Sequence, residues 1–243
     1  MKKILWVLIL LPILAFANPI DDNCPDNVIW GAPKLKTEVG TQYICRTDYA
    51  VNINYKTKVA NYVVEHIEPF HLTNKVKRRN DFREDKTIPK QFRATLEDYS
   101  GEKYDRGHLA PAANFTHDKF VMSESFLLSN MIPQNKYNNR IIWRVLEEHV
   151  RELAKKHDTY VITGTVFYPN YKIIGNGVGV PDEIYKIVIT DANKVVAYVF
   201  PNKAIKSRKF GRYKVSVIEI EKRTGIDFSP SIPVELKSLE LHP

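Results

Sequence analysis

The sequence is poor in cysteine, because only Cys24 and Cys45 occur among its 243 residues. Both lie far from the histidine that is the candidate base below, and they give no case for a zinc site. The chain also lacks internal repeats and low-complexity tracts. Its ordinary composition excludes wholesale disorder and a multispanning membrane protein. The length suits one domain of moderate size with a full core.

Acidic residues are outnumbered in this chain. Lys and Arg total 36 against 28 Asp and Glu, which gives a formal net charge of +8. This excess favours nucleic acid, anionic lipid or acidic polysaccharide as a partner without choosing among them. A basic surface that binds no polyanion is the alternative. One segment is rich in basic residues that could contact phosphates, with a solvated loop as its alternative: Lys203, Lys206, Arg208, Lys209, Arg212 and Lys214.

No apolar run is long enough for a comfortable membrane span, which needs about 20 residues. The run from Ile4 to Ala15 follows Lys2 and Lys3, and small residues surround a cleavage position after Ala17. This layout predicts a secretory signal peptide over residues 1–17, and so a secreted or periplasmic protein with no stable membrane insertion after cleavage. An uncleaved anchor is the alternative.

The two cysteines predict a disulfide, because an exported chain with an even cysteine count favours pairing. A Cys24–Cys45 bridge would stabilise the fold by roughly 3 kcal/mol in the chain-entropy model. Two free thiols are the alternative. Residues 18–48 are interpreted as an N-terminal arm on the surface, pinned by this disulfide, and residues 49–243 as the main domain.

Alternating apolar residues predict strands and hairpins through much of the main domain. Residues 49–55 and 59–65 form one predicted hairpin, and residues 185–190 and 195–200 form another across a turn at 191–194. The sequence further predicts a helix over 139–156, a strand at 160–164 and a last strand or strand-like segment beginning at 215–217. Strands and helices without regular βαβ alternation indicate an α+β fold.

The segment at residues 104–111, Tyr-Asp-Arg-Gly-His-Leu-Ala-Pro, contains the candidate general base His108. Imidazole titrates near neutral pH, although a single histidine is more often a packed or solvated residue. Arg106 lies on the same side of an extended segment and could reach the same phosphate. Asp105 is a metal ligand or a structural partner of an arginine, and the structural role is favoured. Gly107 lets the backbone pass where a side chain would crowd.

The helix over 139–156 supplies the candidate metal ligand, Asn139. A neutral amide oxygen suits a hydrated Mg²⁺ that takes further oxygens from a phosphate. A helix N-cap is the alternative role for this asparagine. Glu147 lies two turns further and would grip a metal-bound water, with a solvated helix glutamate as the alternative. Trp143 between them is predicted to pack.

Four motifs together resemble the DNA/RNA non-specific endonuclease family of the ββα-metal (His-Me finger) superfamily, which includes secreted bacterial nucleases and endonuclease G. They are Asp105–Pro111, Leu128–Gln134, Asn139 with Trp143 and Glu147, and Arg79–Asp85. The similarity extends over residues 50–228. It implies a ββα-metal finger fold whose central sheet is mainly antiparallel, with helices packed on it.

The resemblance also implies roles for individual residues. Asn139 would bind a single Mg²⁺, for which Mn²⁺ substitutes, and His108 would be the general base. Arg106 and Arg79 would steady the phosphate, and Arg78 is the competing alignment for Arg79. Two further matches complete the implied site: Asn130, which helps to place the histidine or the phosphate, and Glu147, near the metal-bound water.

These expectations predict an exported, Mg²⁺-dependent endonuclease that hydrolyses DNA and RNA to 5′-phosphate ends. A non-catalytic polyanion-binding protein and a phosphodiesterase with a narrower substrate are the alternatives. Besides DNA and RNA, the partners to consider are a second copy of the chain and an inhibitor protein.

Overall fold

The computed structural model describes residue 24 and residues 27–28, 31–73, 75–191 and 194–238. The predicted signal peptide, residues 1–17, lies outside this part of the chain. Within it, no helix has the length and apolar character to cross a membrane.

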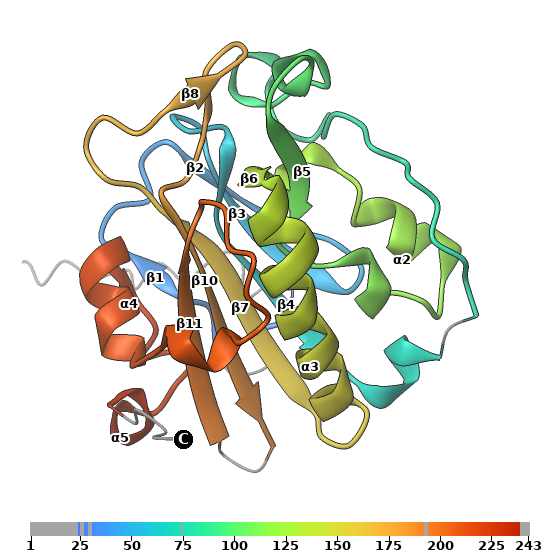
Figure 1. Cartoon of the computed structure of the whole chain (residues 1–243), viewed down its shortest axis with the longest axis vertical. Coiled ribbons are helices and arrows are strands. Elements are labelled where there is room, and N and C mark those ends of the chain that lie inside the picture. The colour runs from blue at the N-terminus through green and yellow to red at the C-terminus, as the bar shows by residue number, and fades with distance from the viewer. Residues whose placement is uncertain (1–23, 25–26, 29–30, 74, 192–193, 239–243) are drawn as a thin grey trace, which may run out of the picture.

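The described residues fold around a seven-stranded antiparallel sheet with the strand order β12-β11-β10-β7-β4-β3-β2 (Figure 1). β-branched and aromatic residues fill its central strands, which suits a sheet that is covered on both faces. The strands are β2 (Thr41–Cys45), β3 (Tyr49–Asn54), β4 (Val59–Ile67), β7 (Thr159–Val166), β10 (Glu183–Thr190), β11 (Lys194–Pro201) and β12 (Lys214–Val215).

The predicted hairpins are confirmed. β3 pairs with β4, and β10 pairs with β11 in a register that brings Thr190 opposite Lys194. The strand predicted at 160–164 is the fully buried β7, between β4 and β10. The α+β fold with a mainly antiparallel central sheet is therefore confirmed.

Each face of the sheet has its own apolar core. Alternate residues of β7 point to opposite faces, so that Val161 belongs to one core and Ile162 to the other. α3 (Arg144–Ala154) packs on the first face, and α4 (Val217–Thr224) on the second. The other helices are α2 (Lys119–Glu124), α5 (Val234–Lys237), 3₁₀ turns η1 (Pro69–Leu72), η2 (Lys90–Phe92), η3 (Glu97–Tyr99), η4 (Ala112–Asn114), η5 (Leu128–Asn130) and η7 (Phe210–Tyr213), and the π-helical η6 (Asn138–Trp143).

Three small two-stranded sheets complete the described fold. They join β1 (Lys34–Leu35) with β13 (Ile226–Asp227), β5 (Tyr104–His108) with β6 (Met131–Asn135), and β8 (Ile173–Ile174) with β9 (Val178–Gly179). The β5–β6 hairpin lies beside the beginning of α3 in Figure 1, and these elements position the site described below.

The prediction of a strand or strand-like segment beginning at 215–217 is wrong beyond Val215. β12 ends there, and α4 begins at Val217. The Ser216 side chain accepts a hydrogen bond from the Glu219 N–H and so caps this helix. Val217 and Ile220 are buried, so a short amphipathic helix satisfies the apolar residues that suggested a strand.

The N-terminal arm is anchored in the fold and does not simply lie on its surface. Cys24 and Cys45 form the predicted disulfide, with their Cα atoms 5.6 Å apart. Val28 and Ala32 are buried in the second core. The Tyr62 hydroxyl donates to the arm at the Pro33 carbonyl, 2.8 Å away. β2 is a strand of the central sheet, so the structural unit begins well before the boundary predicted at residue 49.

Candidate active site

The candidate site is built on the β5–β6 hairpin and the helical segment that follows it. In this hairpin Arg106 lies opposite Pro133, and His108 lies opposite Met131. Gly107 is required sterically, because a Cβ at this position would lie 2.0 Å from Gln134 Oε1. A larger residue at position 107 would therefore clash with the paired strand. Arg106 and His108 stand two residues apart in β5, so their side chains project to the same side of the strand.

His108 is 92% buried, yet its Nε2 has no hydrogen-bond partner in the described part of the chain. Phe126 stands perpendicular to the imidazole at 4.9 Å, and Phe82 lies 5.7 Å away, measured between ring centroids. Burial, aided by the charge of Arg78, lowers the pKa of His108 to about 3. The ring is therefore neutral at physiological pH, which is the form that accepts a proton.

Asn130 fixes the chain immediately after His108. Its Oδ1 accepts the Ala110 N–H at 2.9 Å, and its Nδ2 donates to the carbonyls of Ala110 at 2.8 Å and Ser125 at 2.9 Å. The Leu109 N–H donates to the Asn130 backbone carbonyl. Asn130 is fully buried, so it cannot contact a phosphate directly. Of the two roles predicted for it, these contacts favour placing the histidine.

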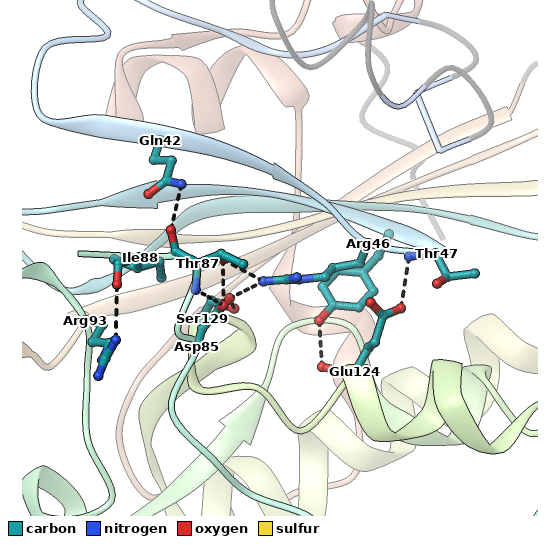
Figure 2. Close-up of polar contacts among 10 residues, drawn as sticks. Gln42, Arg46, Thr47, Asp85, Thr87, Ile88, Arg93, Glu124 and Ser129 are labelled. Atoms are coloured by element: carbon teal, nitrogen blue, oxygen red, sulfur yellow. Dashed lines mark hydrogen bonds and ion pairs between the residues drawn. The ribbon is translucent and has the colours of Figure 1, made fainter. Parts of the chain in front are cut away.

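A polar network connects Asn130 with the disulfide region. Ser129 donates to the Asp85 carboxylate at 2.6 Å, and Arg46, which follows Cys45, forms an ion pair with the same carboxylate. Figure 2 shows Arg46, Thr87 and Ser129 converging on Asp85. Although burial opposes it, the hydrogen bonds from Ser129 and Thr87 and the charge of Arg46 lower the pKa of Asp85. This buried anion therefore ties the disulfide region to η5.

Arg106 is half-buried, and its guanidinium lies 4.3 Å above the centroid of Phe82. Phe82 also contacts the His108 ring, so the predicted proximity of Arg106 and His108 is supported. Stacking on an aromatic ring leaves the edge of a guanidinium available for a bidentate phosphate contact.

The structure places Arg78, not Arg79, at this site. The Arg78 guanidinium lies 5.0 Å from the centroid of Phe126, and its charge acts on both His108 and Glu147. Arg79 instead lines a neighbouring pocket with Lys75 and other residues. These contacts favour Arg78, the competing alignment, as the arginine beside His108, because two adjacent residues of this extended segment face different surroundings.

Asn139 lies in η6, at the start of the helical half of the site. The sequence predicted a regular α-helix over 139–156, but its first turn belongs to this π-helix, and the α-helix α3 begins at Arg144. Its Nδ2 donates to Asp105 Oδ2 at 3.0 Å, and no described residue donates to its Oδ1. The neighbouring Asn138 amide is occupied, since it accepts from Gln134 and donates to the Pro201 carbonyl. Of these two asparagines, it is Asn139 whose amide oxygen accepts no hydrogen bond from a described residue.

Asp105 acts as a structural partner, the role that was favoured for it. Besides Asn139 it accepts two hydrogen bonds from Arg140, at 2.6 and 2.7 Å. Although burial alone would raise it, the bonds from Arg140 and Asn139 lower the pKa of Asp105. The carboxylate thus orients the Asn139 amide.

Glu147 is half-buried in the first turn of α3. Burial raises the pKa of Glu147, and the charges of Lys186, Arg151 and Arg78 oppose this shift. The alternative of a freely solvated glutamate is therefore not supported. Trp143, one turn before it, is buried as predicted.

Beneath Glu147 lie buried polar residues that the sequence analysis missed. Glu65 of β4 accepts a hydrogen bond from Asn114 at 2.8 Å, and Lys186 of β10 donates to Thr163. Burial raises the pKa of Glu65 to about 7. Glu65 and Lys186 each interrupt an otherwise apolar strand, and that interruption was the available signal.

Comparisons with known proteins agree with this geometry. The model of the DNA/RNA non-specific endonuclease family matches residues 30–235. Nuclease C1 of Cunninghamella echinulata var. echinulata is 34% identical over 212 residues, covering 79% of this chain and 84% of that protein. Mitochondrial endonuclease G of Homo sapiens is 35% identical over 229 residues, covering 87% and 75%. A chain in the crystal structure of an EndoG/EndoGI complex is similar with a TM-score of 0.78 and 30% identity, covering 90% of this chain and 94% of that chain.

Proposed function

Because the chain belongs to the DNA/RNA non-specific endonuclease family, we propose that it is an exported, Mg²⁺-dependent nuclease that cuts both DNA and RNA and leaves 5′-phosphate ends. The family and its relatives are metal-dependent nucleases, so hydrolysis of phosphodiester bonds follows from membership. One observation supports the mechanism most directly: the buried, unpaired Nε2 of His108 on the same side of β5 as Arg106.

His108 takes a proton from the attacking water at Nε2. The low pKa of the ring keeps it neutral, and the absence of a partner among the described residues leaves its lone pair free. Asn130 holds the adjoining backbone, so the ring stays directed at the reaction site.

Asn139 Oδ1 fits the role of ligand to a hard cation. Mg²⁺ prefers oxygen ligands and keeps several waters, so one fixed protein oxygen is compatible with a site completed by water and substrate phosphate. When bound, such an ion would stabilise negative charge on the phosphate and the leaving oxygen. Asp105 keeps the Asn139 amide in the orientation that presents its oxygen.

Arg106 and Arg78 hold the phosphate beside His108. Both guanidiniums lie over aromatic rings that also contact the histidine, namely Phe82 and Phe126. Charge-assisted contacts to phosphate oxygens would position the phosphorus for in-line attack. Glu147 is proposed to accept from a metal-bound water.

The remaining basic residues suit sequence-independent binding of a polyanion. Lys206 lies 5.6 Å from the ring of Tyr137, which directly precedes η6, so the basic segment at 203–214 reaches the site. Phosphate contacts of this kind carry little sequence information. Export remains part of the proposal, supported by the N-terminal sequence and the disulfide. An inhibitor protein is a further proposed partner, because the solved EndoG relative is described in an inhibited complex.

The test is degradation of plasmid DNA and of RNA by the purified protein, with Mg²⁺, with EDTA, and with the variant His108→Ala. We expect cleavage of both substrates with Mg²⁺, none with EDTA, and a loss of about 100-fold or more in the variant. His157→Ala, at an exposed histidine, is the matched control and should cut at the wild-type rate. A His108→Ala protein that cuts as fast as wild type would exclude this mechanism. Failure to cut either substrate with any divalent ion would favour a binding protein.

A further inference from the structure

Three ligand-type side chains outside the nuclease site converge on one point. Asp48 lies in the turn between β2 and β3, His71 in η1, and His117 between η4 and α2. Asp48 Oδ2 lies 3.1 Å from His117 Nε2 and 3.6 Å from His71 Nε2, and one ligand atom from each of the three residues lies within 4.8 Å of the others. We propose that Asp48, His71 and His117 form a second metal site, of the kind that binds Zn²⁺, distinct from the catalytic Mg²⁺ site.

The three side chains lie close together without forming hydrogen bonds through Asp48 Oδ2. Asp48 Oδ2 is buried and hydrogen-bonds to no described residue, although two ring nitrogens lie close to it. Zn²⁺ binds nitrogen and oxygen at about 2.0–2.2 Å, which places tetrahedral ligands about 3.3–3.6 Å apart. The Asp48–His71 separation of 3.6 Å falls in this range and the Asp48–His117 separation of 3.1 Å lies just below it, although neither contact is a hydrogen bond.

The surroundings favour a cation. The carboxylates of Glu68, Asp118 and Glu124 add negative potential around Asp48. Two of these carboxylates already have partners. Asp118 accepts from the N–H groups at the start of α2, and Glu124 accepts from the Thr47 N–H at 3.0 Å. The proposed ligands are therefore the carboxylate of Asp48 and the imidazoles of His71 and His117.

This ligand set indicates the metal. Two imidazoles with a carboxylate suit Zn²⁺, whereas Mg²⁺ prefers oxygen ligands and near-octahedral geometry. Three protein ligands would leave a fourth position for water. The side chains of Asp48, His71 and His117 are 13%, 7% and 16% exposed, so the point is sheltered but reachable from solvent. Phe70 packs against both imidazole rings and shields them.

The structure also gives the site a supporting frame. Thr116, directly before His117, donates from both its N–H and its hydroxyl to the His71 carbonyl, which holds the two histidine segments together. No hydrogen bond or ion pair between described residues joins the cluster to Asn139 or Glu147. A bound metal would therefore join three chain segments and stabilise the fold, without requiring the nuclease site.

Binding would change one hydrogen bond in a way that can be observed. His71 Nδ1 accepts the Glu68 N–H at 3.1 Å, so in the metal-free protein the ring proton is on Nε2. Coordination through Nε2 requires this proton to move to Nδ1, which can then no longer accept the Glu68 N–H, so the Glu68 contact must rearrange. The Glu68 amide signal is therefore a local reporter of metal binding at this site.

The experiment is a titration of the metal-free, mature protein with Zn²⁺ in millimolar Mg²⁺. Binding is monitored by calorimetry and by NMR of the histidine ring nitrogens and backbone amides. We expect one Zn²⁺ per chain at this site, with shifts at His71, His117 and the Glu68 amide. Asp48→Asn and His117→Ala should weaken binding by at least about 100-fold, since even outer partners of a metal ligand contribute about 10- to 100-fold. His157→Ala, at an exposed histidine, should bind as wild type does.

Two results would overturn the proposal: unchanged Zn²⁺ affinity in both Asp48→Asn and His117→Ala, or Zn²⁺-dependent shifts at His108 alone. If the variants do not fold, Co²⁺ added to the wild type decides the question. Visible bands of four-coordinate Co²⁺ that Zn²⁺ abolishes support the site, and their absence refutes it. Mg²⁺-dependent DNA cleavage is measured in parallel, so a failure here is distinct from a failure of the proposed nuclease activity.

Discussion

Asn130 offers the sharpest test of how the fold positions His108, the proposed general base. In Asn130→Ala the Ala110 N–H and the carbonyls of Ala110 and Ser125 lose their partner. All three bonds are buried, and leaving a buried polar group unsatisfied costs about 1–3 kcal/mol. Because effects at neighbouring groups are not additive, we expect a loss of about 3–5 kcal/mol in the free energy of unfolding. That is a large part of the stability of a typical domain, about 5–15 kcal/mol.

The functional effect should exceed what unfolding explains. Ala110 lies two residues after His108, so freeing it lets the imidazole move relative to the scissile phosphate. A displacement of about 1 Å in such a site can cost about 100-fold in rate. We therefore expect kcat to fall by about that factor in protein that is still folded, while the Mg²⁺ concentration for half-maximal activity stays near the wild-type value.

The assay combines urea denaturation with plasmid cleavage at a temperature where the variant is folded. Asn138→Ala is the matched control, because it removes another buried asparagine near the site that contacts Gln134 and Pro201 instead of the histidine segment. It should lose stability but keep most of its kcat. Equal losses of kcat in the two variants, or a stable Asn130→Ala protein, would refute the positioning role.

Three further predictions follow from the site. First, Asn139→Ala should raise the Mg²⁺ requirement at least about tenfold with little loss of stability, because its free oxygen is the proposed ligand; an unchanged Mg²⁺ titration would contradict this. Second, Arg78→Ala should lower kcat/KM by about 10- to 100-fold and Arg79→Ala by much less, since a charge-assisted hydrogen bond contributes about 1.5–3 kcal/mol; the reverse order would favour Arg79 as the phosphate-binding residue. Third, the low pKa of His108 means that the unfolded chain binds its proton first, so the histidine's contribution to stability is complete above about pH 6.5 and is lost as the pH falls toward 3. His108→Gln should therefore gain on wild type by up to about 1.4 kcal/mol for each pH unit below 6.5 in urea denaturation, and parallel pH curves would show that the shift is absent.

The hairpins of the central sheet could be predicted because their signal is local. Strand alternation and turn composition are properties of adjacent residues, and the predicted pairing reappears in β10 and β11, where Thr190 lies opposite Lys194. The missed helix α4 shows the limit of this reasoning. Val215 and Val217 suggest a strand, and only the Ser216 cap together with burial of Ile220 makes the helix the better solution.

The linear sequence by itself determined the residue types of the proposed nuclease site. His108, Arg106 and Asn139 stand in motifs whose chemistry is visible without coordinates, and the structure places them on one hairpin and the helix beside it. The sequence could not decide between Arg78 and Arg79, because the direction of a side chain in an irregular segment depends on what packs against it. Phe126, nearly fifty residues later, provides that contact for Arg78.

Only the tertiary structure decided which polar groups are buried and which are free. Asn138 and Asn139 are chemically identical neighbours, but Gln134 and the remote Pro201 occupy the amide of Asn138, whereas no described residue donates to the amide oxygen of Asn139. The same holds for Asp48, His71 and His117, which are separated by long stretches of sequence and share one point in space. Sequence patterns report local geometry, whereas desolvation and convergence depend on contacts between segments that are remote along the chain.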